Sequence, residues 1–60
     1  MIDTYRAYAT RTDGITQEVY HGDSRWAAER VAEAKRKHGW TAWVVRIPAG
    51  TDTEQKVTKP

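Results

Sequence analysis

The sequence predicts a small α+β domain of order ββαβ, in which a three-stranded antiparallel sheet of strand order 2-1-3 carries one helix on one face. Residues 2–11 and 40–47 alternate in polarity with the two-residue period of strands. Residues 24–38 instead repeat small apolar side chains with the period of a helix. A right-handed crossover leaves the second and third strands parallel, so the first strand is expected to lie between them.

The turn TDG, at residues 12–14, joins the first two strands. A two-residue Asp-Gly loop would pair Thr12 with Ile15, whereas a type I turn with Gly14 in the left-handed region pairs Arg11 with Ile15. Only the second register places Ile15 and Val19 on the apolar face of the first strand, and a slip of one residue would invert that face. We therefore predict a second strand at residues 15–21. Its inward residues are Ile15 and Val19, and its outward residues are Thr16, Glu18 and Tyr20.

The helix is expected to begin at Asp23 or Ser24, either of which can cap it, and to end before Gly39. Its predicted buried stripe consists of Ala27, Ala28, Val31, Ala32, Ala34 and His38. The preceding HGDS segment contains the three residue types of a hydrolytic triad. Four consecutive residues rarely adopt triad geometry, and capping already explains the Asp and the Ser. We predict no catalytic residues.

The third strand, residues 40–47, has two faces of different size. Trp43, Val45 and Ile47 form the larger apolar set, so they are expected to face the helix, with Trp43 as the core tryptophan. Trp40 then points away or lies at the mouth of the strand beside Gly39, and Trp26 covers the edge of the core. Pro48 ends the strand and the domain, which spans residues 1–48. Residues 49–60 are expected to form a flexible polar tail, leaving the second sheet face uncovered.

That uncovered face is the predicted partner-binding site, because Tyr and Arg are enriched at protein interfaces. Its residues are Arg6, Tyr8, Tyr20, Val44 and Arg46. A secondary basic patch on the helix consists of Arg30, Arg36 and Lys37. Cations are in any case favoured near the C-terminus of a helix, which offers a purely structural explanation of that patch.

Composition narrows the expected function. The 60 residues include no Cys and two His without metal-ligand spacing, so neither a metal nor another cofactor is expected. No apolar run is long enough to cross a membrane and no signal peptide is evident, so a cytoplasmic location is expected. The net charge of +2 permits contact with nucleic acid without arguing for it.

The sequence therefore predicts a non-enzymatic protein-interaction module that acts on no small-molecule substrate. It is expected to form a homodimer or, as a phage or accessory protein, to bind a host protein through the uncovered sheet face. The alternative is a small nucleic-acid-binding regulator, in which the same aromatic and Arg side chains stack on bases and contact phosphates.

Overall fold

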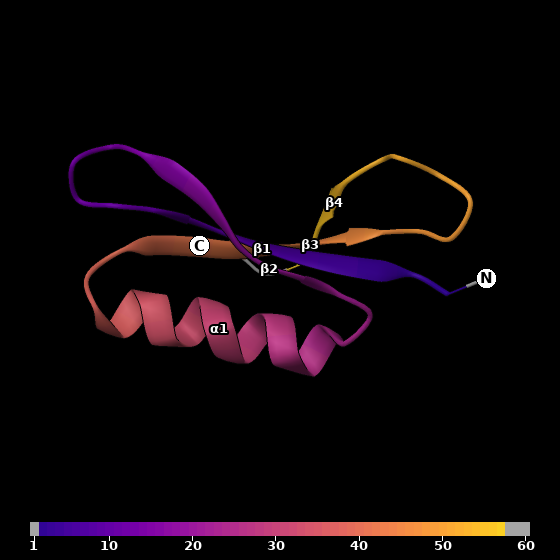
Figure 1. Ribbon diagram of the computed structural model, residues 1–60, viewed down its shortest axis with the longest axis horizontal. Helices are drawn as coiled ribbons and strands as arrows, with labels where there is room; N and C mark the ends of the chain where they lie inside the picture. The colour runs from indigo at the N-terminus through magenta and orange to yellow at the C-terminus, as the bar shows by residue number, and fades with distance from the viewer. Residues whose placement is uncertain (1, 58–60) are drawn as a thin grey trace.

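The computed structural model describes residues 2–57, which form one helix packed against one face of a four-stranded antiparallel sheet (Figure 1). The elements are β1 (Thr4–Thr10), β2 (Thr16–Gly22), α1 (Arg25–Lys37), β3 (Thr41–Ile47) and β4 (Gln55–Lys56). Their order in the sheet is β2-β1-β3-β4. The α+β class and the 2-1-3 core of the sheet agree with the prediction. The predicted number of strands is wrong, because residues of the expected tail add β4.

The turn between β1 and β2 has the predicted register. Gly14 has a φ of +92°, its N–H donates to the carbonyl of Arg11 at 2.9 Å, and the Arg11 N–H donates to Ile15 at 2.8 Å. Further along β2, Tyr20 lies opposite Ala7 and Glu18 lies opposite Tyr8. The residue between them, Val19, is therefore an extra one, and the strand contains a β-bulge there.

The bulge changes which side chains of β2 face the helix. Val19 and Tyr20 both pack against the core, so the outward orientation predicted for Tyr20 is wrong. Ile15 is 51% exposed, although it was expected inside. The β1–β2 hairpin, whose turn precedes Ile15, curls away from α1 (Figure 1).

Ser24 caps α1, and its hydroxyl accepts a hydrogen bond from the Ala27 N–H at 3.1 Å. Gly39, at a φ of +86°, follows the C-terminal cap at His38. Ala34 and His38 are exposed and Trp26 is 70% exposed, so the burial expected of these three residues is wrong. Successive residues of a helix are rotated by about 100°, so Trp26 lies about 200° around the axis from Ala28, on the side of α1 away from the sheet.

Small side chains form the interface between α1 and the sheet. The fully buried cluster consists of Ala7, Ala9, Ala28, Ala32, Ala42 and Val44. Because these alanines extend no further than Cβ, helix and sheet can approach closely, and a tryptophan has no room between them. Ala42 and Val44 therefore face α1. The predicted orientation of β3 is wrong by one residue, and Trp43 lies on the opposite face.

Trp40 instead packs against the core cluster, at the point where the chain passes from α1 into β3. The backbone N–H of Trp40 donates to the Lys35 carbonyl at 3.1 Å, and the Lys35 ammonium lies 4.7 Å from the Trp40 ring centroid. The hydrogen bond to the C-terminal turn of α1 thus fixes the position of the Trp40 backbone, from which the ring extends. Trp40, and not Trp43, is therefore the tryptophan that packs against the core. Its ring lies at the edge of the contact between α1 and the sheet, where the close approach of the two layers does not exclude it.

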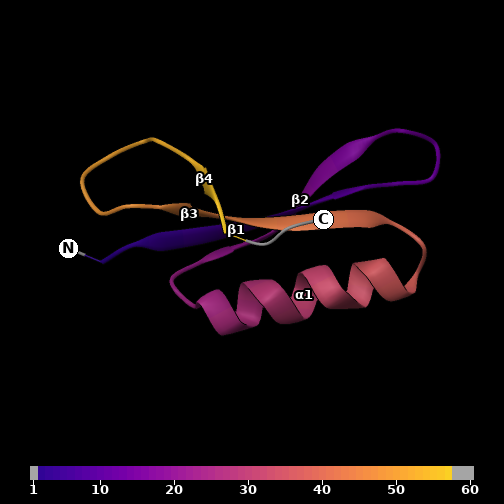
Figure 2. The ribbon, with the colours of Figure 1, turned by 180° about the vertical axis from the view of Figure 1, so that it is seen from behind.

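The segment after β3 turns back across the sheet. The Val57 N–H donates to the Val44 carbonyl at 2.9 Å, and its side chain packs against the core. Figure 2 shows that the β3–β4 hairpin lies on the side of the sheet away from α1. The β1–β2 hairpin curls to the same side. The prediction that no part of the chain covers the second face is therefore wrong, because Glu54 contacts Arg6 and Tyr8 there. Part of the expected tail, residues 58–60, lies outside the described residues.

Candidate interaction surface

The sheet face opposite α1 carries an aromatic pair at its centre. Tyr8 of β1 and Trp43 of β3 are direct cross-strand partners, and their ring centroids lie 5.8 Å apart with planes tilted by 30°. Cross-strand aromatic pairs at this separation attract each other beyond their simple burial. The backbone register therefore holds the two rings side by side, on a face that the helix does not cover.

Glu54, from the loop before β4, reaches back over this pair. Its Oε2 accepts a hydrogen bond from the Tyr8 hydroxyl at 2.5 Å and lies 3.4 Å from Nη1 of Arg6. The carboxylate and partial burial raise the pKa of the Tyr8 hydroxyl, because both disfavour a phenolate, while Arg6 opposes this shift. One carboxylate oxygen thus joins the C-terminal segment to two residues of β1.

Lys56 makes a second contact from the same segment. Its ammonium lies 5.4 Å from the Trp43 ring centroid, within the range of a cation–π interaction. Lys56 is also the cross-strand partner of Val45, which is 5% exposed although it lies on the face away from α1. The short β4 strand therefore lies beside Val45 and places a cation against Trp43.

We refer to Arg6, Tyr8, Trp43, Glu54 and Lys56 as the sheet-face site. One atom in it lacks a partner: within residues 2–57, Nε of Arg6 is buried without a hydrogen bond. The site carries charges of both signs. Glu18, the partner of Tyr8 on β2, adds a further carboxylate at its border.

Two of the five residues predicted to line this face, Arg6 and Tyr8, do so. The remaining three, Tyr20, Val44 and Arg46, were assigned to the wrong face. Tyr20 is turned inward by the β2 bulge, and Val44 is fully buried beneath α1. Arg46 lies two residues after Val44 in β3, so it belongs to the same face of the sheet, the one toward α1. Trp43, Glu54 and Lys56 were missed, Trp43 because β3 was assigned the opposite orientation.

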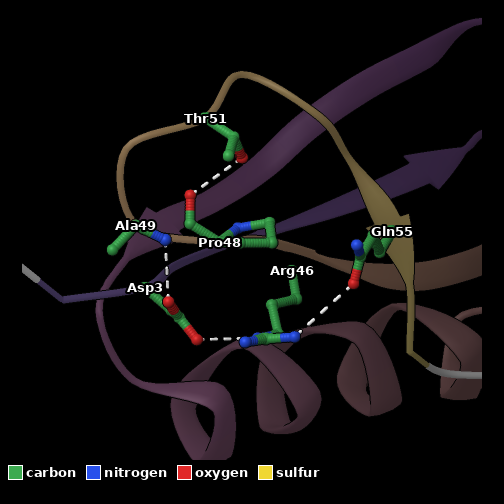
Figure 3. Close-up of polar contacts among 6 residues, drawn as sticks. All are labelled: Asp3, Arg46, Pro48, Ala49, Thr51 and Gln55. Atoms are coloured by element: carbon green, nitrogen blue, oxygen red, sulfur yellow. Dashed lines mark hydrogen bonds and ion pairs between the residues drawn. The ribbon is translucent and has the colours of Figure 1, made fainter.

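Arg46 has a structural role at the end of β3 (Figure 3). Its Nε donates to Asp3 at 2.7 Å, while the other carboxylate oxygen of Asp3 accepts from the Ala49 N–H at 2.8 Å. Two hydrogen bonds lower the pKa of Asp3: the larger effect comes from the Ala49 N–H and the next from the Arg46 guanidinium. Gln55 accepts a longer contact from Arg46 at 3.5 Å. These bonds tie the chain before β1 to the start of the β3–β4 hairpin.

The three residues of the predicted basic patch on α1 each make a different contact within the chain. Arg30 lies over the ring of Trp26, 5.3 Å from its centroid. Arg36 turns toward the sheet, where Nε and Nη2 both donate to the Ala42 carbonyl at 3.1 and 2.8 Å. Lys37 pairs with Glu33 at 3.6 Å. Because Arg36 satisfies a carbonyl of β3, it belongs to the structure of the sheet edge.

Across residues 2–57 there is no enclosed pocket and no group of three or more His, Cys, Asp or Glu side chains placed to hold a metal. No helix in that range is long and apolar enough to cross a membrane.

Comparison with known proteins adds no relative. The chain matches no protein-family model, and neither curated proteins nor solved structures give a significant match.

Proposed function

We propose that the protein is a small non-enzymatic interaction module that binds another protein through its sheet-face site. The Tyr8–Trp43 pair carries this proposal. Tyr, Trp and Arg contribute most of the binding energy at many protein interfaces, since they bury a large area while keeping polar groups available. Here an aromatic pair and Arg6 lie together on a face that α1 leaves free.

The charge of the site favours a protein partner over nucleic acid. Arg6 and Lys56 are accompanied by Glu18 and Glu54, so a phosphate backbone would meet carboxylates as often as cations. Proteins present charges of both signs and can match such a surface. The partner is a second copy of the chain or a different protein. We set the interaction in the cytoplasm, where a chain without cysteine needs no oxidising compartment.

Photo-crosslinking tests the proposal with a control inside the same chain. p-Benzoylphenylalanine replaces Trp43 in one variant and the exposed Trp26, on the outer side of α1, in the other. Irradiation in the native cells should give a protein adduct of defined mass from position 43 and none from position 26. Adding Tyr8→Ser should remove that adduct.

Each alternative has its own outcome. Sedimentation of the purified chain distinguishes a self-adduct, which requires dimers, from an adduct with another protein. A nuclease-sensitive adduct from position 43 would replace the proposal with nucleic-acid binding. Equal adducts from both positions, or none from position 43, would contradict a specific role for the sheet face.

A further inference from the structure

The contact between Arg6 and Glu54 is poor for an arginine–carboxylate pair. The bond measures 3.4 Å, whereas charge-assisted bonds of this kind are usually about 2.7–2.9 Å and often use both carboxylate oxygens. Only Oε2 of Glu54 makes contact with Arg6 and Tyr8. Nε of Arg6 stays buried and unbonded within the described residues. The donors of β1 are thus arranged for an anion and only partly satisfied by Glu54.

The segment that carries Glu54 is exposed up to Val57, whose N–H donates to the Val44 carbonyl of β3. Residues 51–56 are exposed, and β4 pairs with β3 over two residues. Glu54 itself precedes β4 and has no place in the sheet ladder. Its carboxylate can therefore leave Arg6 and Tyr8 without any loss of core packing.

We infer that Arg6 and Tyr8 form a carboxylate-binding site, which Glu54 fills in the free protein and which an Asp or Glu side chain of the partner protein fills in the complex. The inference rests on the proposed function and specifies the chemistry of the partner. Glu54 acts as an internal competitor. The incoming carboxylate gains by using both oxygens, one on the Tyr8 hydroxyl and one on the guanidinium edge of Arg6, while its neighbouring residues cover Trp43.

An internal competitor weakens binding in proportion to the time it occupies the site. If Glu54 fills the site about nine-tenths of the time, its removal strengthens binding by about tenfold. Glu54→Ala leaves the residues of β4 in place and therefore isolates this effect. Glu33→Ala is the matched control, because Glu33 is also exposed and ion-paired but lies on α1.

The probe is the peptide N-acetyl-Gly-Glu-Gly amide, with the same peptide containing Gln as its neutral control. Binding is followed by NMR on the full chain, using the backbone amides and the Arg6 Nε–H signal. We expect the Glu peptide to bind Glu54→Ala about tenfold more tightly than it binds the wild type or Glu33→Ala. The shifts should centre on Arg6, Tyr8 and Trp43. Adding Arg6→Gln to Glu54→Ala should abolish binding, and the Gln peptide should not bind.

Equal affinity of wild type and Glu54→Ala, equal binding of the two peptides, or shifts centred elsewhere would overturn the inference. A second measurement is independent of any peptide. The pKa of Tyr8 should fall in Glu54→Ala, followed by spectrophotometric titration against the wild type, and an unchanged value would show that Glu54 does not occupy the site.

The two proposals fail separately. A position-43 protein adduct without a preference for the Glu peptide overturns the carboxylate site alone. Peptide binding without any protein adduct overturns the proposed function and leaves a carboxylate site of unassigned use.

Discussion

Replacing Ala28 with Leu tests the close contact between α1 and the sheet. Ala28 is 0% exposed and belongs to a cluster in which alanines from both layers meet. Leu adds three heavy atoms where neighbouring atoms already touch. Overpacking of this kind costs about 1–3 kcal/mol, and the high end is expected here because the backbones themselves must separate.

The size of the chain makes this cost easy to measure. At about 0.05–0.15 kcal/mol per residue, a domain of this length has a total stability of only several kcal/mol. A loss of 1 kcal/mol lowers the thermal midpoint of a 60–100-residue domain by roughly 4–8 °C. We therefore expect Ala28→Leu to lower the midpoint by about 5–20 °C. Thermal and urea denaturation followed by circular dichroism measure both quantities.

Ala34→Leu is the control, because Ala34 is an exposed residue of the same helix. The intrinsic helix propensities of Ala and Leu differ by a few tenths of a kcal/mol at most, so this variant should melt close to the wild type. A midpoint for Ala28→Leu within about 2 °C of that for Ala34→Leu would refute the tight alanine interface, since the inserted side chain would then have found free space.

Four further predictions follow from named contacts. Trp40→Ala should cost about 2–3 kcal/mol in urea denaturation, since Trp40 packs against the core but is only half-buried; a loss below about 1 kcal/mol would contradict that packing. Gly14→Ala should cost about 1 kcal/mol through backbone strain alone, because its φ is +92° and an added Cβ meets nothing within 4 Å; equal stability of Gly14→Ala and wild type would argue against the bulged turn. The lowered pKa of Asp3 means that its contribution to stability is present above its unfolded pKa and is lost as the pH falls through the folded one; in acid titrations Asp3→Asn should remove that part of the pH dependence, and an identical pH profile would contradict the Asp3–Ala49 bond. Deleting residues 51–60 should lower the thermal midpoint, because it removes β4 and the packing of Val57; an unchanged midpoint would show that this segment contributes no stability.

The local features of this chain could be derived from its sequence. Ser24 and Gly39 bound the helix because capping depends on a few neighbouring residues. Asp13-Gly14 fixes the hairpin register through the left-handed φ that glycine accepts. Since the period of alternation and the rules of chain crossover need no distant information, the α+β class and the position of β1 between β2 and β3 followed as well.

The orientation of β3 was decided by tertiary packing. Hydrophobicity favoured Trp43, Val45 and Ile47 as the inner set, but the alanine stripe of α1 leaves space only for Ala42 and Val44. The sequence offers two apolar faces of β3. The small space between α1 and the sheet determines which of the two faces the helix. The bulge at Val19 also depends on tertiary structure, because no local sequence signal marks the extra residue. The bulge moves Tyr20 from the predicted outer face to the face that packs against the core.

The sheet-face site depended on tertiary structure for the same reason. The sequence determined Arg6 and Tyr8, which lie on the central strand with an unambiguous parity. Trp43 joined them only when packing reversed β3. Glu54 and Lys56 joined because a polar segment without strong periodicity formed two residues of strand against β3, a pairing between residues about ten apart that no short-range pattern encodes. The sequence by itself determined the elements and their order, and the room between helix and sheet decided which side chains meet on the opposite face.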